Sequence, residues 1–212
     1  MASAEDCRKS GIIPIIAEIK PKALARPLTG EEVMSYARAY AKNQACAISV
    51  LTEPTHFLGA LENVAIARRA GLPVLRKDFI FDERQICEIQ ADLVLLIAAL
   101  GIDLDRFIDA AKEAGMEPLV EVHTEEEMEM ALATDARIIG INNRNLKTLE
   151  VDLGTFERLA PRAREAGTFL IAESGVHSHE DAQRMVRAGA DALLVGTELM
   201  ARPERLRELN RI

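Results

Sequence analysis

The chain has 212 residues, of which 49% are hydrophobic and 28% are charged, and its formal net charge is −8. This composition supplies a full hydrophobic core, which excludes a disordered chain, and the length suits one domain. Acidic and basic side chains are interleaved, which excludes the clustered lysines and arginines of a nucleic-acid-binding protein.

Short apolar runs recur eight times along the chain, and each ends at a polar or glycine-containing group. The stretches between the runs are amphipathic with a helical period, which indicates that strands and helices alternate. The runs cover residues 12–20, 47–53, 73–78, 93–99, 118–123, 138–144, 169–175 and 192–197.

Several of the intervening helices have clear start signals. Thr29 with Glu32, and Thr124 with Glu127, match the capping box, and Ser178 is a third N-cap. Further helices are expected over residues 56–69, 83–90, 103–114 and 202–210, with a broken pair over 153–166.

Eight alternating strands and helices are typical of a parallel (β/α)8 barrel, an α/β fold with outer helices. A doubly wound open sheet is the alternative, but no Gly-x-Gly-x-x-Gly or Walker-type loop follows any run. No Pro/Gly/Ser-rich linker divides the chain, so we expect one domain over residues 1–212. Chemistry in such barrels occurs at the carboxyl ends of the strands.

The cysteines and the N-terminal segment indicate where the protein works. Cys7, Cys46 and Cys87 are odd in number and lack Cys-x-x-Cys spacing, which favours a reducing cytoplasm over disulfides or a zinc site. No apolar run is long enough to span a bilayer, and residues 1–11 lack the apolar stretch of a secretion signal. We expect a cytoplasmic protein without membrane contact, and a monomer, because no exposed apolar stripe stands out.

Charged and amide side chains gather where the strands are expected to end. Alternate residues of a strand share a face, so such pairs point the same way. The pairs are Glu18 with Lys20, Glu121 with His123, and Asn142 with Arg144, and Lys77 and Glu173 end two further runs. One such residue alone is typical of a salt-bridged surface, but a set on five strands predicts an acid–base active site. Such a cluster can shift protonation both ways: a partly desolvated lysine crowded by another cation loses its proton more easily, whereas a carboxylate in an apolar pocket holds its proton longer.

Two glycine-containing turns follow the last two runs. Ser174 and Gly175 come after the seventh run, and Gly196 and Thr197 after the eighth. Barrels of this kind commonly hold a phosphate there with backbone N–H groups and a short extra helix, which residues 198–201 are expected to form. Single glycines in such loops are usually only turns, but the pair favours a small phosphorylated ligand.

The four histidines show no metal-ligating pattern, and His56 and His123 have no obvious partners. We therefore expect no metal site.

Seven motifs stand in order at the expected strand ends. They are Ile-Ile-Ala-Glu-Ile-Lys (15–20), Leu-Thr-Glu-Pro-Thr-His-Phe (51–57), Leu-Arg-Lys-Asp-Phe-Ile (75–80), Val-Glu-Val-His (120–123), Gly-Ile-Asn-Asn-Arg-Asn-Leu (140–146), Ile-Ala-Glu-Ser-Gly-Val (171–176) and Leu-Val-Gly-Thr (194–197). Together they closely resemble the indole-3-glycerol phosphate synthase family, from about residue 12 to the C-terminus.

The resemblance implies a carbon–carbon lyase of tryptophan biosynthesis that uses no cofactor or metal. That family converts 1-(2-carboxyphenylamino)-1-deoxyribulose 5-phosphate into indole-3-glycerol phosphate, carbon dioxide and water. By this resemblance Lys77 is the general acid of ring closure and Glu121 is the general base of the later steps. Lys20 holds the substrate carboxylate and delivers a proton during dehydration, while Glu18 and Glu173 orient the lysines.

The resemblance also implies the binding residues. Asn142 and Arg144 are expected to support the ribulose hydroxyls and the anthranilate end. The expected phosphate cradle consists of Ser174, Gly175, Gly196 and Thr197.

The chain departs from the family pattern in two places. After Lys20 the family usually has Ser-Pro-Ser, whereas Ala23 and Ala25 stand here without hydroxyls, and Lys22 and Arg26 are the candidates to replace them by charge. Family members usually carry a longer N-terminal extension over the barrel mouth, whereas residues 1–11 form only a short segment here.

Two other functions remain open from the residues. Another phosphate-binding barrel, such as phosphoribosylanthranilate isomerase, would use an acid–base pair but release no carbon dioxide; Glu-Ile-Lys and Lys-Asp-Phe in the first and third runs disfavour it. The other is an inactive or engineered barrel of the same family that binds ligands without turnover.

Overall fold

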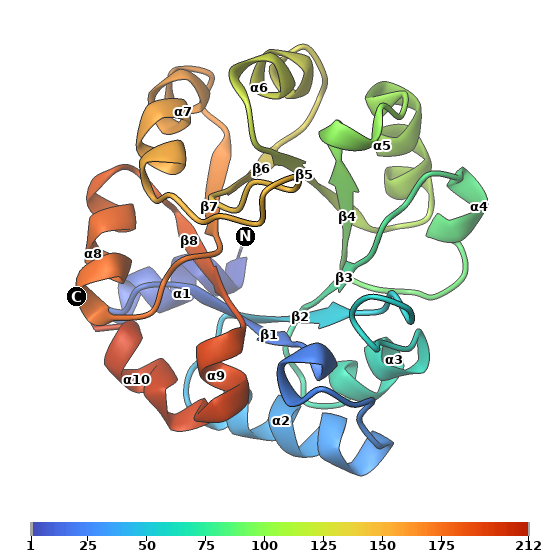
Figure 1. Ribbon diagram of the computed structural model, residues 1–212, viewed down its shortest axis with the longest axis vertical. Helices are drawn as coiled ribbons and strands as arrows, with labels where there is room; N and C mark the ends of the chain where they lie inside the picture. Colours follow the sequence, from blue (N-terminus) through green and yellow to red (C-terminus); the bar gives the residue numbers. More distant parts are fainter. Residues whose placement is uncertain (1, 212) are drawn as a thin grey trace.

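The computed structural model describes residues 2–211, and its eight parallel strands form a closed barrel (Figure 1). Each strand pairs with its neighbours in chain order, and β8 pairs back with β1. This closure confirms the (β/α)8 barrel and excludes the open sheet. The strands are β1 (Ile15–Ile19), β2 (Ala47–Leu51), β3 (Val74–Lys77), β4 (Leu93–Ile97), β5 (Glu117–Val122), β6 (Ile138–Asn142), β7 (Phe169–Glu173) and β8 (Ala192–Val195).

Helices surround the barrel and bury its outer face (Figure 1). They are α1 (Ala2–Lys9), α2 (Gly30–Lys42), α3 (Glu62–Arg68), α4 (Glu83–Ile86), α5 (Leu104–Glu113), α6 (Glu125–Leu132), α7 (Gly154–Glu165), α8 (His179–Arg187), α9 (Thr197–Ala201) and α10 (Leu206–Leu209), with 3-10 turns at Pro21–Leu24, Ala98–Leu100 and Pro203–Arg205. Apolar side chains form one core between the helices and the sheet and a second inside the barrel. Across residues 2–211, every helix is too short or too polar to traverse a lipid bilayer.

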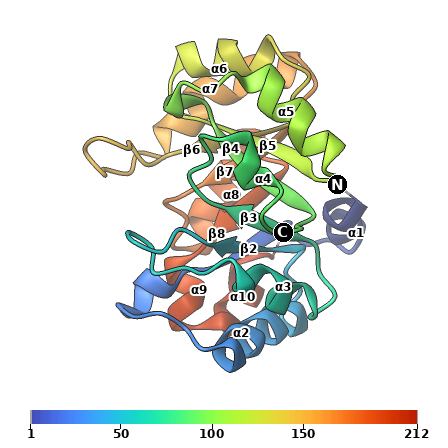
Figure 2. The same ribbon diagram turned by 90° about the vertical axis from the view of Figure 1, so that its right-hand side faces the viewer.

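Helix α1 was not predicted from the sequence, and it lies at the end of the barrel opposite the loop that joins β6 to α7 (Figure 2). Arg8 on α1 forms an ion pair of 2.5 Å with Asp191, and its guanidinium lies 5.6 Å from the ring centroid of Phe169. Cys7 packs against the apolar core inside the barrel. The helix therefore covers the amino ends of the strands, away from the face where chemistry is expected.

The predicted helix over residues 56–69 is wrong in its first half, because α3 begins only at Glu62. The reason is the side chain of Glu53, which accepts hydrogen bonds from the backbone N–H groups of Thr55, His56 and Phe57 at 2.7, 2.6 and 2.9 Å. A carboxylate that satisfies three successive donors stabilises a loop instead of a helical turn.

The other helix predictions need three smaller corrections. The expected broken pair over 153–166 is the single helix α7, which continues through Pro161 because its apolar face is fully buried. Residues 202–210 divide into a 3-10 turn and α10. Helix α4 ends at Ile86 with Cys87 as its C-cap, and the carbonyl of Gln85 accepts hydrogen bonds both from the backbone N–H of Glu88 and from Arg76.

Gly140 in the middle of β6 leaves room for an acidic side chain from the next strand. A Cβ atom at this position would overlap the carboxylate of Glu173 and lie 2.9 Å from Cδ2 of Leu119. Neither group can withdraw easily, because both are fully buried. The glycine therefore allows Glu173 to turn inward at the end of the barrel.

We predict that Gly140→Ala lowers the free energy of unfolding by about 1–3 kcal/mol, the usual cost of overpacking a core. Gly30→Ala is the matched control: Gly30 begins α2, and the new methyl would meet only the flexible end of Ile66, at 3.1 Å. Urea denaturation measures both variants. Equal stabilities for the two variants would contradict the proposed packing constraint.

Candidate active site

A cavity lies at the carboxyl ends of the strands, and all eight strands or the loops that follow them contribute to its lining. All residues with a predicted catalytic or binding role except Glu173 line it, and these residues are Glu18, Lys20, Lys77, Glu121, Asn142, Arg144, Ser174, Gly175, Gly196 and Thr197. Glu173 is completely buried and reaches the cluster from β7. The barrel thus gathers residues that are up to 179 positions apart, from Glu18 to Thr197.

The ammonium group of Lys77 lies at the centre of this cluster. Its Nζ is 3.1 Å from Oε2 of Glu121 and forms a second, shorter ion pair with Oε2 of Glu173. Both carboxylates are almost inaccessible to solvent, with exposures of 2% and 0%. A buried cation between two buried acids is a strongly coupled group, in which the charge of each member depends on the others.

Burial opposes a charge on Lys77, but the negative charges of Glu173, Glu121 and Glu18 outweigh it and raise the lysine pKa above its ordinary value. The expectation that a second cation lowers this pKa is therefore wrong. Lys20, the cation in question, has its Nζ 4.0 Å from Glu18, whereas three carboxylates act on Lys77. The lysine accordingly carries its proton at neutral pH.

The pKa values of the two acids of the cluster shift in opposite directions. Burial raises the pKa of Glu121, but Lys77 and His123 outweigh it, and the pKa falls below its ordinary value. Burial also raises the pKa of Glu173, and there the attraction of Lys77 is not enough, since Glu121 adds repulsion. Glu121 is therefore the acid whose ionised form the cluster favours.

His123 has two acidic partners that the sequence analysis did not find. Its Nδ1 lies 2.9 Å from Oε2 of Glu127, and its Nε2 lies 3.2 Å from Oε1 of Glu121. Burial opposes its charge, but the two carboxylates raise its pKa to about 9. Only half of the predicted capping box forms: Thr124 caps α6, whereas the Glu127 carboxylate accepts the backbone N–H of His123 at 2.7 Å. The spacing of four residues between His123 and Glu127 is the feature of the sequence that could have indicated this pair.

Aromatic side chains form one wall of the cavity beside the second lysine. The Nζ of Lys20 lies 5.9 Å from the ring centroid of Phe57, and that ring lies 5.9 Å from the ring of Phe79. Both phenylalanines line the cavity. The site therefore combines ammonium groups with an aromatic wall that suits contact with an aromatic ring.

The two glycine turns close the opposite side. Ser174 and Gly175 have φ angles of 63° and 87°, a left-handed backbone that turns the chain sharply after β7. At Gly196 a Cβ atom would lie 2.5 Å from Oε1 of Glu18, so a side chain there would displace the Glu18 carboxylate from its present position. Thr197 begins the short helix α9, close to the residues where an extra helix was predicted.

A sequence model of the family described as indole-3-glycerol phosphate synthase matches residues 4–212. The chain belongs to the indole-3-glycerol phosphate synthase family. Relatives that carry this name include proteins of Haloarcula marismortui, 46% identical over 92% of this chain and 74% of the relative, and Halobacterium salinarum, 45% identical over 96% and 82%. A third, from Methanocaldococcus jannaschii, is 43% identical over 92% of this chain and 75% of its own.

Solved structures with lower identity show the fold alone. The N-acetylmannosamine-6-phosphate 2-epimerase of Clostridium perfringens is similar with a TM-score of 0.68 at 14% identity, covering 89% of each chain. A thiamine phosphate pyrophosphorylase from Pyrococcus furiosus gives 0.65 at 15% identity, covering 93% of each.

Arg26 is one of the two residues suggested to replace the serines usual in the synthase family, but its side chain bonds to another residue. Arg26 follows the 3-10 turn Pro21–Leu24, but its guanidinium forms two hydrogen bonds with Glu32 on α2, of 2.5 and 3.0 Å. The expectation that Arg26 supplies a charge in place of Ala23 and Ala25 therefore finds no support in its position.

Arg144 also uses part of its hydrogen-bonding capacity within its own loop. Its backbone N–H donates to Oδ1 of Asn142 at 3.0 Å, and its Nη1 donates to the carbonyl of Leu149 at 2.8 Å. These bonds hold the loop between β6 and α7 while the side chain still lines the cavity.

We predict that His123→Gln lowers the free energy of unfolding by about 1–2 kcal/mol at pH 6. This figure is smaller than the full pKa shift would give, because water reaches the imidazole and screens its ion pairs. The folded chain binds this proton more tightly than the unfolded chain, so the contribution is complete below about pH 6.5 and is lost as the pH rises through about 9. Urea denaturation of both proteins at pH 6 and pH 10 measures the difference. A difference that persists at pH 10 would contradict it, and the exposed His56→Gln serves as control.

Proposed function

We propose that this chain converts 1-(2-carboxyphenylamino)-1-deoxyribulose 5-phosphate into indole-3-glycerol phosphate, carbon dioxide and water, with the residues of this cavity in the roles given below. The observation that carries the assignment of roles is the protonated Lys77 between Glu121 and Glu173, with Lys20 in the same cavity. The reaction needs two proton donors and one acceptor, and the cavity contains such a set.

Lys77 acts in the ring closure. As the aromatic carbon that bears the carboxylate attacks the ketone carbon, the ketone oxygen becomes basic and takes a proton from Nζ. The three nearby carboxylates keep that proton on the lysine until the oxygen requires it. The carboxylate then leaves as carbon dioxide, and the electrons of its bond restore the aromatic ring.

Lys20 and Glu121 act in the dehydration. Lys20 gives a proton to the departing hydroxyl, and Glu121 takes one from the adjacent carbon. Two protons are given and one is recovered, so one net proton comes from solvent and offsets the charge lost with the carboxylate. Glu121 suits this role because Lys77 and His123 stabilise its ionised form.

The remaining side chains bind and orient the substrate. Backbone groups of the two glycine turns, with the hydroxyls of Ser174 and Thr197, hold the phosphate. Asn142 and Arg144 support the ribulose hydroxyls and the anthranilate end. The wall that contains Phe57 faces the aromatic ring. Two ammonium groups in one cavity favour the lyase over an isomerase, because both a carbonyl and a departing hydroxyl then find a donor.

We also infer that the reaction takes place in the cytoplasm. The three cysteines are free thiols, which accords with a reducing compartment. A charged phosphate ester is also retained where it is made.

Replacing the central acid and base tests these roles. We predict that Lys77→Met and Glu121→Gln each lower kcat by about 10²–10⁴-fold, the usual effect of removing a general acid or base. Production of the indole ring, followed by its fluorescence after addition of the substrate, measures the rate. Lys112→Met and Glu129→Gln remove surface ion pairs outside the cavity and serve as controls. Near-normal turnover in both site variants would refute the roles.

We further predict that Arg26→Gln changes KM for the phosphorylated substrate by less than about twofold. Its guanidinium bonds to Glu32 instead of facing the cavity, so no phosphate contact is lost. Steady-state kinetics at low salt give the comparison with the wild type. A tenfold increase in KM, about 1.4 kcal/mol of binding energy, would show that Arg26 reaches the phosphate.

A further inference from the structure

Arg76 lies directly before Lys77 on β3, and it is the largest of the fully buried side chains, with 1% exposure. Successive residues of a strand point to opposite faces, so Lys77 enters the barrel whereas Arg76 points outward, beneath α4. A guanidinium cannot lose its proton in a protein, so this charge must be paired inside the molecule.

The guanidinium bonds to three residues: Gln85 on α4, Glu88 just after α4 and Asp78 just after β3. One nitrogen, Nη1, donates to the carbonyl of Gln85 on α4. The other, Nη2, donates to Oε2 of Glu88 at 2.9 Å and to Oδ2 of Asp78 at 3.2 Å. Two carboxylates therefore offset the buried charge, a helix carbonyl accepts one of its N–H groups, and the end of β3 is tied to α4.

Asp78 extends these bonds to the neighbouring strand. Its Oδ2 accepts a hydrogen bond from the hydroxyl of Thr52 at 2.6 Å, and its Oδ1 accepts the N–H of Phe79 at 2.9 Å. The backbone N–H of Thr52 in turn donates to the carbonyl of Lys77 at 3.0 Å. The residue that follows Lys77 is thus fixed from both sides, by Arg76 and by the end of β2.

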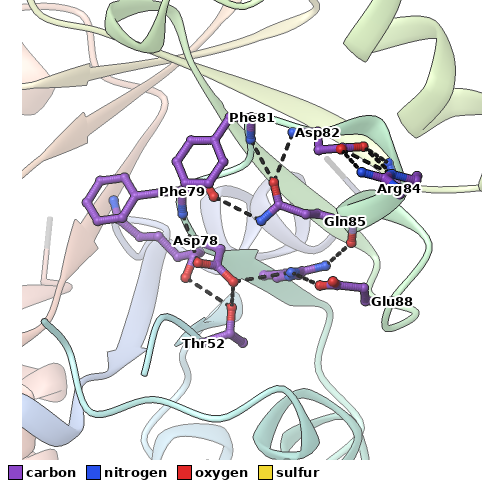
Figure 3. Close-up of polar contacts among 10 residues, drawn as sticks. Thr52, Asp78, Phe79, Phe81, Asp82, Arg84, Gln85 and Glu88 are labelled. Atoms are coloured by element: carbon purple, nitrogen blue, oxygen red, sulfur yellow. Dashed lines mark hydrogen bonds and ion pairs between the residues drawn. The ribbon is translucent and has the colours of Figure 1, made fainter. Parts of the chain in front are cut away.

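Gln85 extends the hydrogen bonds of Arg76 to the loop between β3 and α4. Its Oε1 accepts the N–H groups of Phe81 and Asp82 at 2.8 and 2.9 Å, and its Nε2 donates to the carbonyl of Phe79 at 3.3 Å. Arg76 holds the main chain of Gln85. Figure 3 shows how the Gln85 side chain in turn bonds to the loop at Phe79, Phe81 and Asp82. The ring of Phe79 lines the cavity from this loop.

We propose that Arg76 is a positioning residue for the reaction: through Asp78 and Gln85 it fixes the direction in which Lys77 leaves β3 and the place of the Phe79 wall. The proposal rests on the proposed function, because Lys77 is the acid that it positions. Arginine suits this task better than an apolar residue, since its planar fork bonds in fixed directions to several groups at once. An error of about 1 Å in the position of a catalytic group costs about 10²-fold in rate.

The test compares Arg76→Met and Arg76→Lys with Leu159→Ala, a destabilising change in the buried face of α7. We expect Arg76→Met to lower kcat by about 10–100-fold while KM changes less than threefold, because Lys20 and the glycine turns lie on other strands. Arg76→Lys should recover part of the loss. Leu159→Ala should keep the kcat of its folded fraction. Wild-type kcat in Arg76→Met, or an equal loss in Leu159→Ala, would overturn the proposal.

Hydrogen exchange gives a readout that does not depend on turnover. The amides of Phe79, Phe81 and Asp82 should exchange at least tenfold faster in Arg76→Met but not in Leu159→Ala. If the wild type makes no product while this difference appears, the proposed function fails and the positioning of the loop stands. If the wild type is active and the difference is absent, Arg76 does not position the loop.

Two milder variants cover the case in which Arg76→Met does not fold. Gln85→Met frees the loop while Arg76 keeps its carboxylates, and Thr52→Val removes one bond to Asp78. We expect kcat to fall about 5–20-fold in the first and about 2–5-fold in the second. Gln90→Ala, whose amide bonds to Ala91 and Ala114 instead, is the matched control and should retain the wild-type rate. Wild-type kcat in both test variants would overturn the proposal.

Discussion

The ion cluster around Lys77 is the interaction on which the rest of the site depends. Burying an ammonium or a carboxylate alone costs several kcal/mol, so each member of the cluster is tolerated only because the others are present. The cluster also shifts the pKa values of its members: those of Lys77 and Glu173 are raised and that of Glu121 is lowered, so Lys77 stays charged and Glu121 stays ionised. A single electrostatic arrangement thus prepares both an acid and a base, which is what a reaction with several proton transfers requires.

The barrel supports this cluster by leaving space and by fixing directions. Gly140 and Gly196 stand where a side chain would displace the carboxylates of Glu173 and Glu18. Outside the strand, the buried charge of Arg76 is matched by acids and by a helix carbonyl. The same strand therefore carries the proposed general acid Lys77 on its inner face and the buried Arg76 on its outer face. Because successive residues of a strand point to opposite faces, one residue of β3 enters the cavity while its neighbour bonds to the outer layer.

Much of this was predictable from the sequence, because strand period and strand ends are local properties. The parts that were missed depend on choices between distant partners. The Glu53 carboxylate bonds to the backbone of the loop before α3, which keeps that loop out of the helix, and Arg76 bonds to the carbonyl of Gln85 near the end of α4. Glu127 bonds to His123 instead of completing its capping box. The direction of the Lys77 pKa shift depends on three acids that surround the lysine in the fold, and no local pattern in the sequence shows that they meet there.

The most direct test of the account is the titration of Lys77 itself. Lysine labelled with ¹³C at Cε reports its protonation by NMR, and the Lys77→Met variant assigns the signal. We expect the Lys77 resonance to remain that of an ammonium up to pH 11 in the free enzyme, beyond the ordinary lysine value of about 10.4. A Lys77 signal that titrates at or below that ordinary value would contradict the claim that the buried acids hold its charge.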